Sequence, residues 1–165
     1  GRIDALVHGA GVVEDKLVAD KTQASFDRVL GTKTRALDLL LTHEAAAGYR
    51  HVLFFSSIAG RLGNRGQADY GAANEILNRA ALWVAATRPD VRVASINWGP
   101  WGGAGMASEA VNAQFVARGI HPIDLVQGAA LANRVLGDDA APVEVIAGRG
   151  DWMENLGAEA PPTQA

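Results

Sequence analysis

The sequence predicts an α/β fold in which helices cover a parallel β-sheet, and three observations support it. Short apolar runs alternate with longer segments whose apolar residues recur every three or four positions, a pattern typical of strands joined by crossover helices. These runs end in glycine or small polar residues, which suit the turns that follow parallel strands. A chain of 165 residues with 48% hydrophobic residues also has enough apolar material for a core.

The first part of the chain predicts two strands with a long helix between them. Residues 3–7 form an apolar run that we expect to be a strand buried on both faces. Thr22 is the predicted N-cap of a helix whose apolar stripe continues until Gly48. Residues 52–55 predict the second strand, which stops at a pair of serines.

The rest of the chain predicts a loop followed by more helices and strands. The loop at residues 60–66 has glycine at every third position, but no Lys-Ser/Thr pair follows it, so we expect a turn-rich loop and not a phosphate cradle. The later elements are predicted at residues 67–86 (helix), 91–98 (strand), 108–118 and 123–136 (helices) and 143–147 (strand). Residues 152–165 resemble the start of an interdomain linker, which leaves residues 1–151 as the folded part.

Composition argues against several kinds of partner and site. A net charge of -3 provides no broad basic surface for nucleic acid. No apolar run approaches the roughly 20 residues of a membrane span, so a membrane partner is not expected. The absence of cysteine suits a cytoplasmic protein, and the four histidines lack the spacing of metal ligands, so no metal site is predicted. Each histidine, His8 among them, is expected to be a packing or surface residue.

Lys33 breaks the apolar stripe of the first predicted helix. It lies three residues after Leu30 and four before Leu37, on the face that should point toward the core. Its stem could run along the stripe while the ammonium reaches solvent. Alternatively, Lys33 is a cation positioned at a site.

Tyr70 and Asn74 form a second polar interruption, one turn apart on the next helix. If they are buried, both side chains need hydrogen-bond partners. The pattern fits either a tyrosine packed with its hydroxyl in water and an asparagine near the helix start, or a phenol donor with a polar neighbour. Ser57 ends the second strand on the side where ligands bind, so its hydroxyl could meet a substrate carbonyl.

These residues carry a resemblance to a known family. Lys33 and Ser57 precede Tyr70 by 37 and 13 residues, and residues 53–60 and 66–70 closely resemble the ketoreductase domains of modular polyketide and multidomain fatty acid synthases. These domains belong to the short-chain dehydrogenase/reductase superfamily. Most members of the superfamily carry Tyr-x-x-x-Lys, whereas this chain has Asn74 at the last position. Synthase ketoreductases exchange the Lys and Asn positions, and Lys33 with Asn74 matches that exchange.

The resemblance implies an activity, and several segments look most like the polyunsaturated fatty acid synthase branch. It implies NADPH-dependent reduction of a β-ketoacyl thioester on an acyl carrier protein. Tyr70 would be the general acid, Lys33 would favour its phenolate, and Ser57 would hold the carbonyl oxygen. Asn74 would order a relay water or Lys33 itself. The residues that the resemblance places at the cofactor are Gly9, Ala10, Gly11, Lys33, Tyr70, Pro100 and Trp101.

The same resemblance predicts the stereochemistry of the product. Family members that give the D-type alcohol usually carry Leu-Asp-Asp where this chain has Val-Glu-Asp ending at Asp15. Members that give the opposite alcohol carry a Trp where this chain has Leu62. We assign Asp15, Leu62 and Met106 to substrate orientation and expect the D-type alcohol.

The motifs also indicate that the chain is a partial domain. They cover the catalytic half of a Rossmann-type three-layer fold, while the N-terminal strands with their Gly-x-Gly-x-x-Gly loop are absent. The missing half and the neighbouring synthase domains are therefore expected partners, and we expect the isolated segment to reduce nothing. The main alternative is a non-catalytic structural or cofactor-binding fragment of a synthase. A sugar epimerase of the same superfamily is disfavoured, because it should retain Tyr-x-x-x-Lys.

Overall fold

A computed structural model describes residues 3–103, 105–106, 109–117 and 119–150. Its central feature is a parallel sheet of the strands β1 (Ala5–His8), β2 (His51–Ser57), β3 (Arg92–Trp98) and β5 (Glu144–Ala147), in the order β1-β2-β3-β5. Each strand pairs in parallel with its neighbour, so the carboxyl ends of all four lie at one edge of the sheet. The expected α/β fold with a parallel sheet is confirmed.

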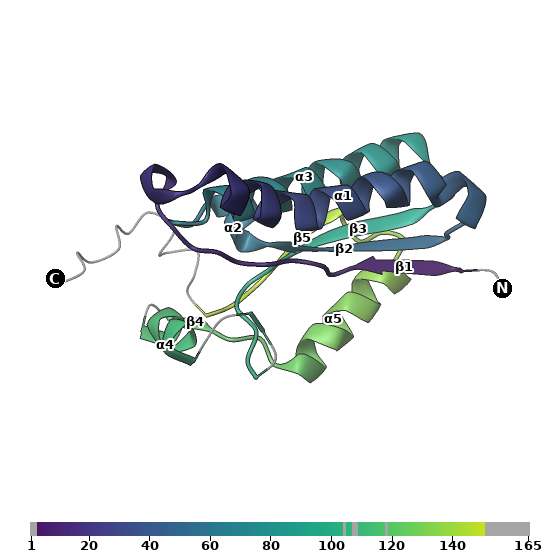
Figure 1. The fold of residues 1–165 in the computed structure, drawn as a ribbon. Helices are drawn as coiled ribbons and strands as arrows, with labels where there is room; N and C mark the ends of the chain where they lie inside the picture. The colour runs from purple at the N-terminus through teal and green to yellow at the C-terminus, as the bar shows by residue number, and fades with distance from the viewer. Residues whose placement is uncertain (1–2, 104, 107–108, 118, 151–165) are drawn as a thin grey trace, which may run out of the picture.

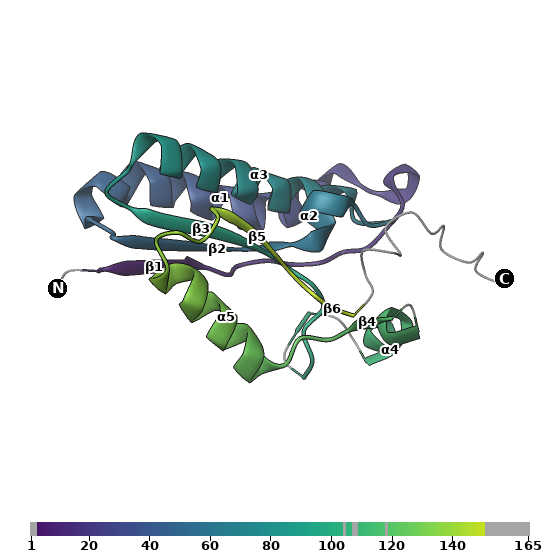
Figure 2. The ribbon, with the colours of Figure 1, turned by 180° about the vertical axis from the view of Figure 1, so that it is seen from behind.

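Helices cover both faces of this sheet (Figures 1 and 2). The long helices α1 (Gln23–Ala47) and α3 (Ala68–Thr87) lie side by side on one face, and α5 (Leu125–Gly137) lies on the other. The smaller elements are η1 (Val18–Asp20), α2 (Ile58–Leu62), α4 (Glu109–Ala117), β4 (Ile120–His121) and β6 (Arg149–Gly150). The last two form an antiparallel pair that the sequence patterns did not predict.

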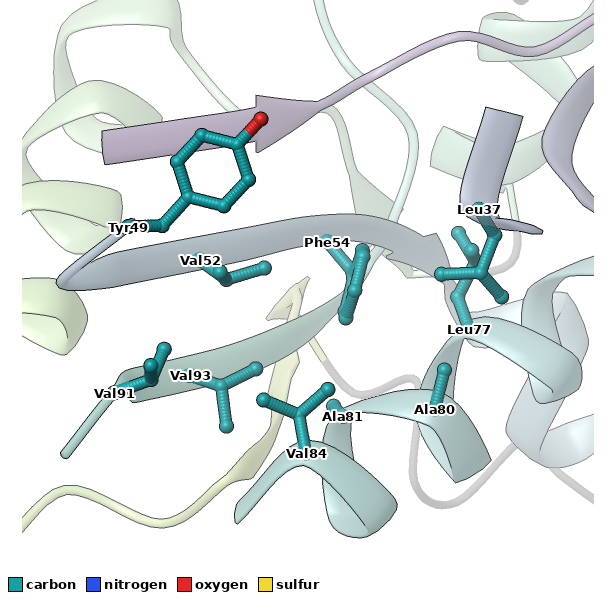
Figure 3. Close-up of a cluster of buried hydrophobic side chains, with 10 residues drawn as sticks. All are labelled: Leu37, Tyr49, Val52, Phe54, Leu77, Ala80, Ala81, Val84, Val91 and Val93. Carbon is teal, nitrogen blue, oxygen red and sulfur yellow. The ribbon is translucent and has the colours of Figure 1, made fainter. Parts of the chain in front are cut away.

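The apolar core follows from the alternation of side chains along the strands. Val52 and Phe54 of β2 point toward α3, whereas Leu53 lies in a second cluster with α5 residues on the opposite face. Figure 3 shows the first cluster, in which the side chains of β2 and β3 meet those of α1 and α3. Its members are Leu37, Tyr49, Val52, Phe54, Leu77, Ala80, Ala81, Val84, Val91 and Val93. This cluster fixes α3, which carries two of the predicted site residues, against the sheet.

Strand β1 differs from its prediction. We expected a strand buried on both faces, but Ala5 is exposed and the Val7 side chain is 55% exposed. The reason is its place in the sheet: β1 pairs with β2 on one side and forms an edge of the described sheet on the other. The strand therefore carries the composition of a central strand while lying at an edge.

The predicted loop at residues 60–66 is partly helical, which corrects a second expectation. Ser57 caps α2, because its hydroxyl oxygen accepts a hydrogen bond from the Ala59 amide at 3.2 Å. Gly63 then ends the helix with a φ of 75°, in the left-handed region that glycine adopts without strain. The loop therefore begins as one helical turn directly after β2.

The predicted start of the long helix is confirmed. The hydroxyl oxygen of Thr22 accepts a hydrogen bond from the Ser25 amide at 3.2 Å, as expected of an N-cap. The predicted linker, by contrast, lies outside the described residues.

Candidate active site

The predicted catalytic residues come from three elements that meet near the carboxyl end of β2. Lys33 lies on α1, Ser57 ends β2, and Tyr70 and Asn74 lie on α3. The helices α1 and α3 pack side by side on the sheet, which brings Lys33 and Tyr70 together across 37 residues of sequence. The structure thus places a cation, a phenol, a hydroxyl and an amide in one region.

Lys33 points inward and is 3% exposed, so the interpretation of a solvent-reaching ammonium is wrong. Its Nζ atom donates a hydrogen bond to the Phe55 carbonyl oxygen at 2.9 Å. The same atom lies 5.9 Å from the centroid of the Tyr70 ring, within cation–π range. Burial lowers the pKa of Lys33 to about 8, because the charged form loses its hydration. Lys33 is thus a buried cation whose pKa lies well below that of an exposed lysine.

Tyr70 is buried, and its phenol is held in the protonated form. Burial raises the pKa of Tyr70, hydrogen bonding with Ser57 and Asn74 lowers it to a smaller extent, and the negative charge of Asp15 raises it. Lys33 lies over the ring and is not among the groups that shift this pKa. The phenol is therefore a proton donor before any ligand arrives, with a cation beside its ring.

Asn74 contributes an unpartnered acceptor. Its side-chain Nδ2 donates to the Tyr70 carbonyl oxygen at 2.7 Å, and since a carbonyl only accepts, this bond fixes the orientation of the amide. Its Oδ1 atom is buried and has no hydrogen-bond partner within the described ranges. A buried acceptor normally pairs with protein, water or ligand, so Oδ1 marks a position for a donor.

Ser57 serves two roles through one hydroxyl. Its oxygen accepts the capping hydrogen bond of α2, and its hydroxyl also hydrogen-bonds with the Tyr70 phenol, which places the O–H proton beside the phenol oxygen. A carbonyl oxygen near Tyr70 is a suitable acceptor for that proton. Ser57 can therefore hold a substrate carbonyl while it also begins α2.

Gly60 allows α2 to lie close to α3. A Cβ atom at this position would lie 2.8 Å from Cβ of Asn74 and 2.9 Å from the backbone nitrogen of Glu75. Only glycine fits this approach without displacing backbone. The close contact keeps the Ser57 end of α2 beside the Tyr70 and Asn74 turn of α3.

The glycine segment after β1 also lies near Lys33. A Cβ atom at Gly11 would lie 3.2 Å from Cε of Lys33 and 3.7 Å from Cε of Met106, so these three residues converge. Gly9 and Ala10 are exposed, and a Cβ atom at Gly9 would meet nothing within 4 Å. This segment leaves backbone accessible for a ligand beside Lys33.

Trp101 has packing contacts that the sequence did not reveal. Its ring lies 4.7 Å from that of Trp98 and stacks on Phe55 at 6.3 Å, centroid to centroid. A Cβ atom at Gly128 of α5 would collide with this ring, so the two elements are in close contact. Trp101 therefore anchors the loop after β3 to α5, and the cofactor contact predicted for it and for Pro100 stays a prediction.

The residues predicted to orient substrate are placed near the Tyr70 end of α3. The Asp15 carboxylate accepts hydrogen bonds from Nε2 of Gln67, at 3.0 Å for each oxygen. Gln67 is the residue immediately before α3, and Leu62 ends α2. Asp15 thus contacts the residue that precedes the Tyr70 helix, and Leu62 lies shortly before that residue in the chain.

Sequence reasoning missed two groups that support the site, and the first is His8. Its side chain is buried, and its Nε2 lies 3.0 Å from the Lys33 carbonyl oxygen, to which it donates because that oxygen only accepts. Burial lowers the pKa of His8, the bond to Lys33 raises it, and the Lys33 charge lowers it, which favours a neutral ring. No local pattern in the sequence reveals this bond to α1.

The second group is a buried network of short polar side chains between α3 and the sheet. Asn78 donates through Nδ2 to Oδ1 of Asn97 at 3.0 Å and accepts from the Ser95 hydroxyl at 2.7 Å. The Ser56 hydroxyl lies 3.0 Å from the same Oδ1 of Asn97. These bonds fix the rotation of α3 and hence the direction of Tyr70. In the sequence, this network could be recognised only from the four-residue spacing of Asn74 and Asn78, which places both on one face of the helix.

In the part of the chain that the structure describes, no group of three or more His, Asp or Glu residues could hold a metal ion. Over the same residues, no helix combines the length and the apolar character needed to cross a membrane.

Comparisons with known proteins agree with this geometry. A family profile described as KR domain matches residues 1–103. The chain is 40% identical over 149 residues to a polyunsaturated fatty acid synthase of Thraustochytrium sp., covering 90% of this chain and 5% of that protein. It is 38% identical over 120 residues to a 6-methylsalicylic acid synthase of Arthrobotrys oligospora, and the match covers 72% of this chain and 7% of that protein.

Solved structures with the same fold are also ketoreductases. One is the ketoreductase from the first module of phoslactomycin biosynthesis in Streptomyces, with a TM-score of 0.82 and 26% identity, covering 92% of this chain and 34% of that one. Another is a ketoreductase domain from the bacillaene assembly line, with a TM-score of 0.81 and 27% identity. This match covers 93% of this chain and 38% of that one. The chain thus spans about a third of these ketoreductases and a small part of the synthases. It belongs to the ketoreductase domains of polyketide and polyunsaturated fatty acid synthases, in the short-chain dehydrogenase/reductase superfamily.

Proposed function

We propose that the chain supplies the proton-donating half of an NADPH-dependent β-ketoacyl reductase within a synthase. The substrate would be a β-ketoacyl thioester on an acyl carrier protein, and the product the β-hydroxyacyl thioester. The observation that carries this proposal is the buried Tyr70 phenol with Nζ of Lys33 5.9 Å from its ring. Membership of the ketoreductase family supports the reaction class.

The described residues fit a nicotinamide cofactor. Gly9 and Ala10 are exposed and Gly11 lies beside Lys33, so this segment leaves room for a ligand. NADPH, when bound, would supply the hydride that reduces the carbonyl carbon. The residues proposed to hold it are Gly9, Ala10, Gly11, Lys33, Tyr70, Pro100 and Trp101.

The proton would come from Tyr70. Its raised pKa keeps the phenol protonated at neutral pH, so the hydroxyl can donate to the carbonyl oxygen as that oxygen gains negative charge. Once a bound ligand excludes water from the site, the Lys33 ammonium would stabilise the phenolate that proton transfer leaves behind, although it does not lower the pKa of Tyr70 in the protein without ligand. Ser57 donates a hydrogen bond to the same carbonyl oxygen and holds it against Tyr70.

Asn74 would accept a hydrogen bond from a water that returns a proton to Tyr70. The position of the unpartnered Oδ1 one turn beyond Tyr70 supports this assignment.

The product would be the D-type alcohol. Asp15, held by Gln67 beside α3, together with Leu62 and Met106, would orient the acyl chain. Chiral analysis of the reduced thioester tests this, and an L-type product would refute it.

The exposed edge strand β1 and the similarity to synthases suggest which partners the chain has. Exposed apolar side chains on β1 support pairing with the N-terminal half of the domain, which carries the glycine-rich loop. The carrier protein and neighbouring synthase domains complete the proposed assembly. The cytoplasmic location stays a prediction.

Replacement of Tyr70 tests the proposal in the polypeptide that carries the complete reductase domain. Tyr70→Phe removes the proton donor and should lower NADPH-dependent reduction of a β-ketohexanoyl N-acetylcysteamine thioester by at least about 10². NADPH binding, followed by fluorescence titration, should persist. Tyr49→Phe is the matched control, because Tyr49 packs in the apolar core cluster. Near-normal turnover in the Tyr70 variant would remove Tyr70 from the mechanism.

A further inference from the structure

Lys21 and Asp69 form a buried ion pair at the start of the helix that carries Tyr70. Nζ of Lys21 lies 2.6 Å from Oδ2 of Asp69, and the two side chains are 4% and 2% exposed. Two charges removed from water are costly unless they are paired and hydrogen-bonded. Neither residue has a place in the proton and hydride transfer derived above, so their burial calls for another explanation.

Each partner of the pair holds a different segment. Oδ1 of Asp69 accepts a hydrogen bond from the Tyr70 amide at 2.9 Å, which ties the carboxylate to the first turn of α3. Nζ of Lys21 donates to the Glu14 carbonyl oxygen at 2.6 Å. The pair therefore links the backbone next to Asp15 to the backbone of Tyr70.

The segment of residues 13–16, here called the Asp15 segment, touches the start of α3 at further points. The Lys16 amide donates to the Gly66 carbonyl oxygen at 3.0 Å, and Gln67 donates to the Asp15 carboxylate. Val13 packs against the cluster that contains Tyr70. The Gln67 contact is exposed to solvent, where a hydrogen bond contributes little, whereas the ion pair is buried. The Glu14 side chain also accepts hydrogen bonds from Ser25 and Arg28 of α1, so among the contacts of the Asp15 segment with α3 the ion pair is the stronger restraint.

Resting on the reductase function proposed above, we propose that Lys21 and Asp69 are positioning residues that clamp the Asp15 segment onto the Tyr70 end of α3 and so determine the face of the carbonyl that is reduced. The clamp acts on the direction from which the acyl chain reaches Tyr70. It does not act on proton transfer itself, because neither side chain lies on the path from Tyr70 through Asn74.

The test replaces both charges together in the full-length synthase polypeptide. Loss of one charge would leave the other buried and unpaired, which destabilises the fold, whereas a neutral pair avoids that penalty. Lys21→Met with Asp69→Asn keeps the lysine stem length and an acceptor for the Tyr70 amide. Arg79→Gln is the matched control, because it removes an exposed ion pair with Glu75 on the same helix.

Two substrates separate orientation from chemistry. β-Ketohexanoyl N-acetylcysteamine thioester gives a chiral alcohol, whereas cyclohexanone has no acyl chain to orient and gives an achiral one. We expect the double variant to lower the ratio of D-type to L-type alcohol about tenfold, within the range that small misplacements near a site produce. Turnover of cyclohexanone and the thermal midpoint should stay close to those of the Arg79→Gln control. Hydrogen exchange of the Lys16 amide should become faster, since its bond to Gly66 is loosened.

Each other outcome overturns the inference in a distinguishable way. An unchanged ratio of D-type to L-type alcohol in the folded double variant would overturn the positioning role and leave the reductase function standing. An equal loss of turnover with both substrates would do the same. If the double variant does not fold, a second neutral pair, Lys21→Gln with Asp69→Asn, takes its place, and failure of both to fold assigns the pair to stability and rejects the positioning role. If the unmodified protein reduces neither substrate, the proposed reductase function fails and this inference fails with it.

Discussion

At the residue scale, burial sets the charge states of the site. Burial disfavours the charged form of each group, so it keeps the Tyr70 phenol protonated and brings the pKa of Lys33 down to about 8. The two effects leave a proton donor and a cation together at neutral pH. Lys33 is therefore the group whose charge is lost first as the pH rises.

This order of titration predicts the pH dependence of reduction. As the pH rises through about 8, the Lys33 ammonium loses its proton and no longer stabilises the Tyr70 phenolate, so the reduction rate should fall. Tyr70, with its raised pKa, would lose its own proton only at higher pH. The measurement is the rate of thioester reduction from neutral pH upward, through the pKa of Lys33.

A matched variant assigns that fall to Lys33. Arginine stays charged over the whole range, so the residual activity of Lys33→Arg should persist above the pKa of about 8 that Lys33 has. The same descending limb in the variant would instead point to another group.

At the scale of elements, the site depends on how α2 and α3 meet. Gly60 permits a close approach of α2 to α3 that any side chain at this position would prevent. This approach sets the position of Ser57 relative to Tyr70 and Asn74. The buried network of Asn78 and Asn97 fixes α3 from the other side. The catalytic geometry is thus a property of the packed elements.

Gly60→Ala tests this packing. The added methyl group should force α2 and α3 apart and lower the free energy of unfolding by about 1–3 kcal/mol, with a parallel loss of turnover. Chemical denaturation of the complete domain measures the first quantity. Gly137→Ala is the control, since a Cβ atom there meets nothing within 4 Å, and it should change neither. Equal stability of the two variants would contradict the close contact.

The order of the main strands and helices could be predicted because each carries its own local pattern. The strand predicted from the apolar run at residues 52–55 and the capping by Thr22 are examples that the structure confirms. The sequence analysis missed α2 because Gly60 and the glycines that follow it suggest a turn. In the fold, Gly60 allows α2 to approach Asn74 of α3 closely.

The candidate site was predictable in its residue types but not in its supporting contacts. Lys33 and Asn74 stood out because each interrupts an apolar stripe. The bond between His8 and the Lys33 backbone joins residues far apart in sequence, and so does the ion pair of Lys21 and Asp69. Contacts of this kind leave no periodic signal, so they appear only when the chain is folded.

At the scale of the whole molecule, the sheet has an open side. Strand β1 contributes exposed apolar side chains at an edge, although its sequence has the character of a central strand. The side chains proposed for catalysis all lie in the described fold, while the 165 residues contain no Gly-x-Gly-x-x-Gly loop of the kind that cradles cofactor phosphates. If the proposed function holds, we expect this chain to supply the proton-donating groups and a segment that carries such a loop to supply most of the cofactor affinity.

One comparison tests this division most directly: NADPH affinity and β-ketohexanoyl thioester turnover, measured on the isolated 165-residue chain and on the complete domain. The complete domain should bind NADPH and form the β-hydroxy thioester, whereas the isolated chain should bind NADPH poorly and reduce nothing. Turnover by the isolated chain with millimolar or better NADPH affinity would contradict the account, as would a complete domain that leaves the thioester unreduced.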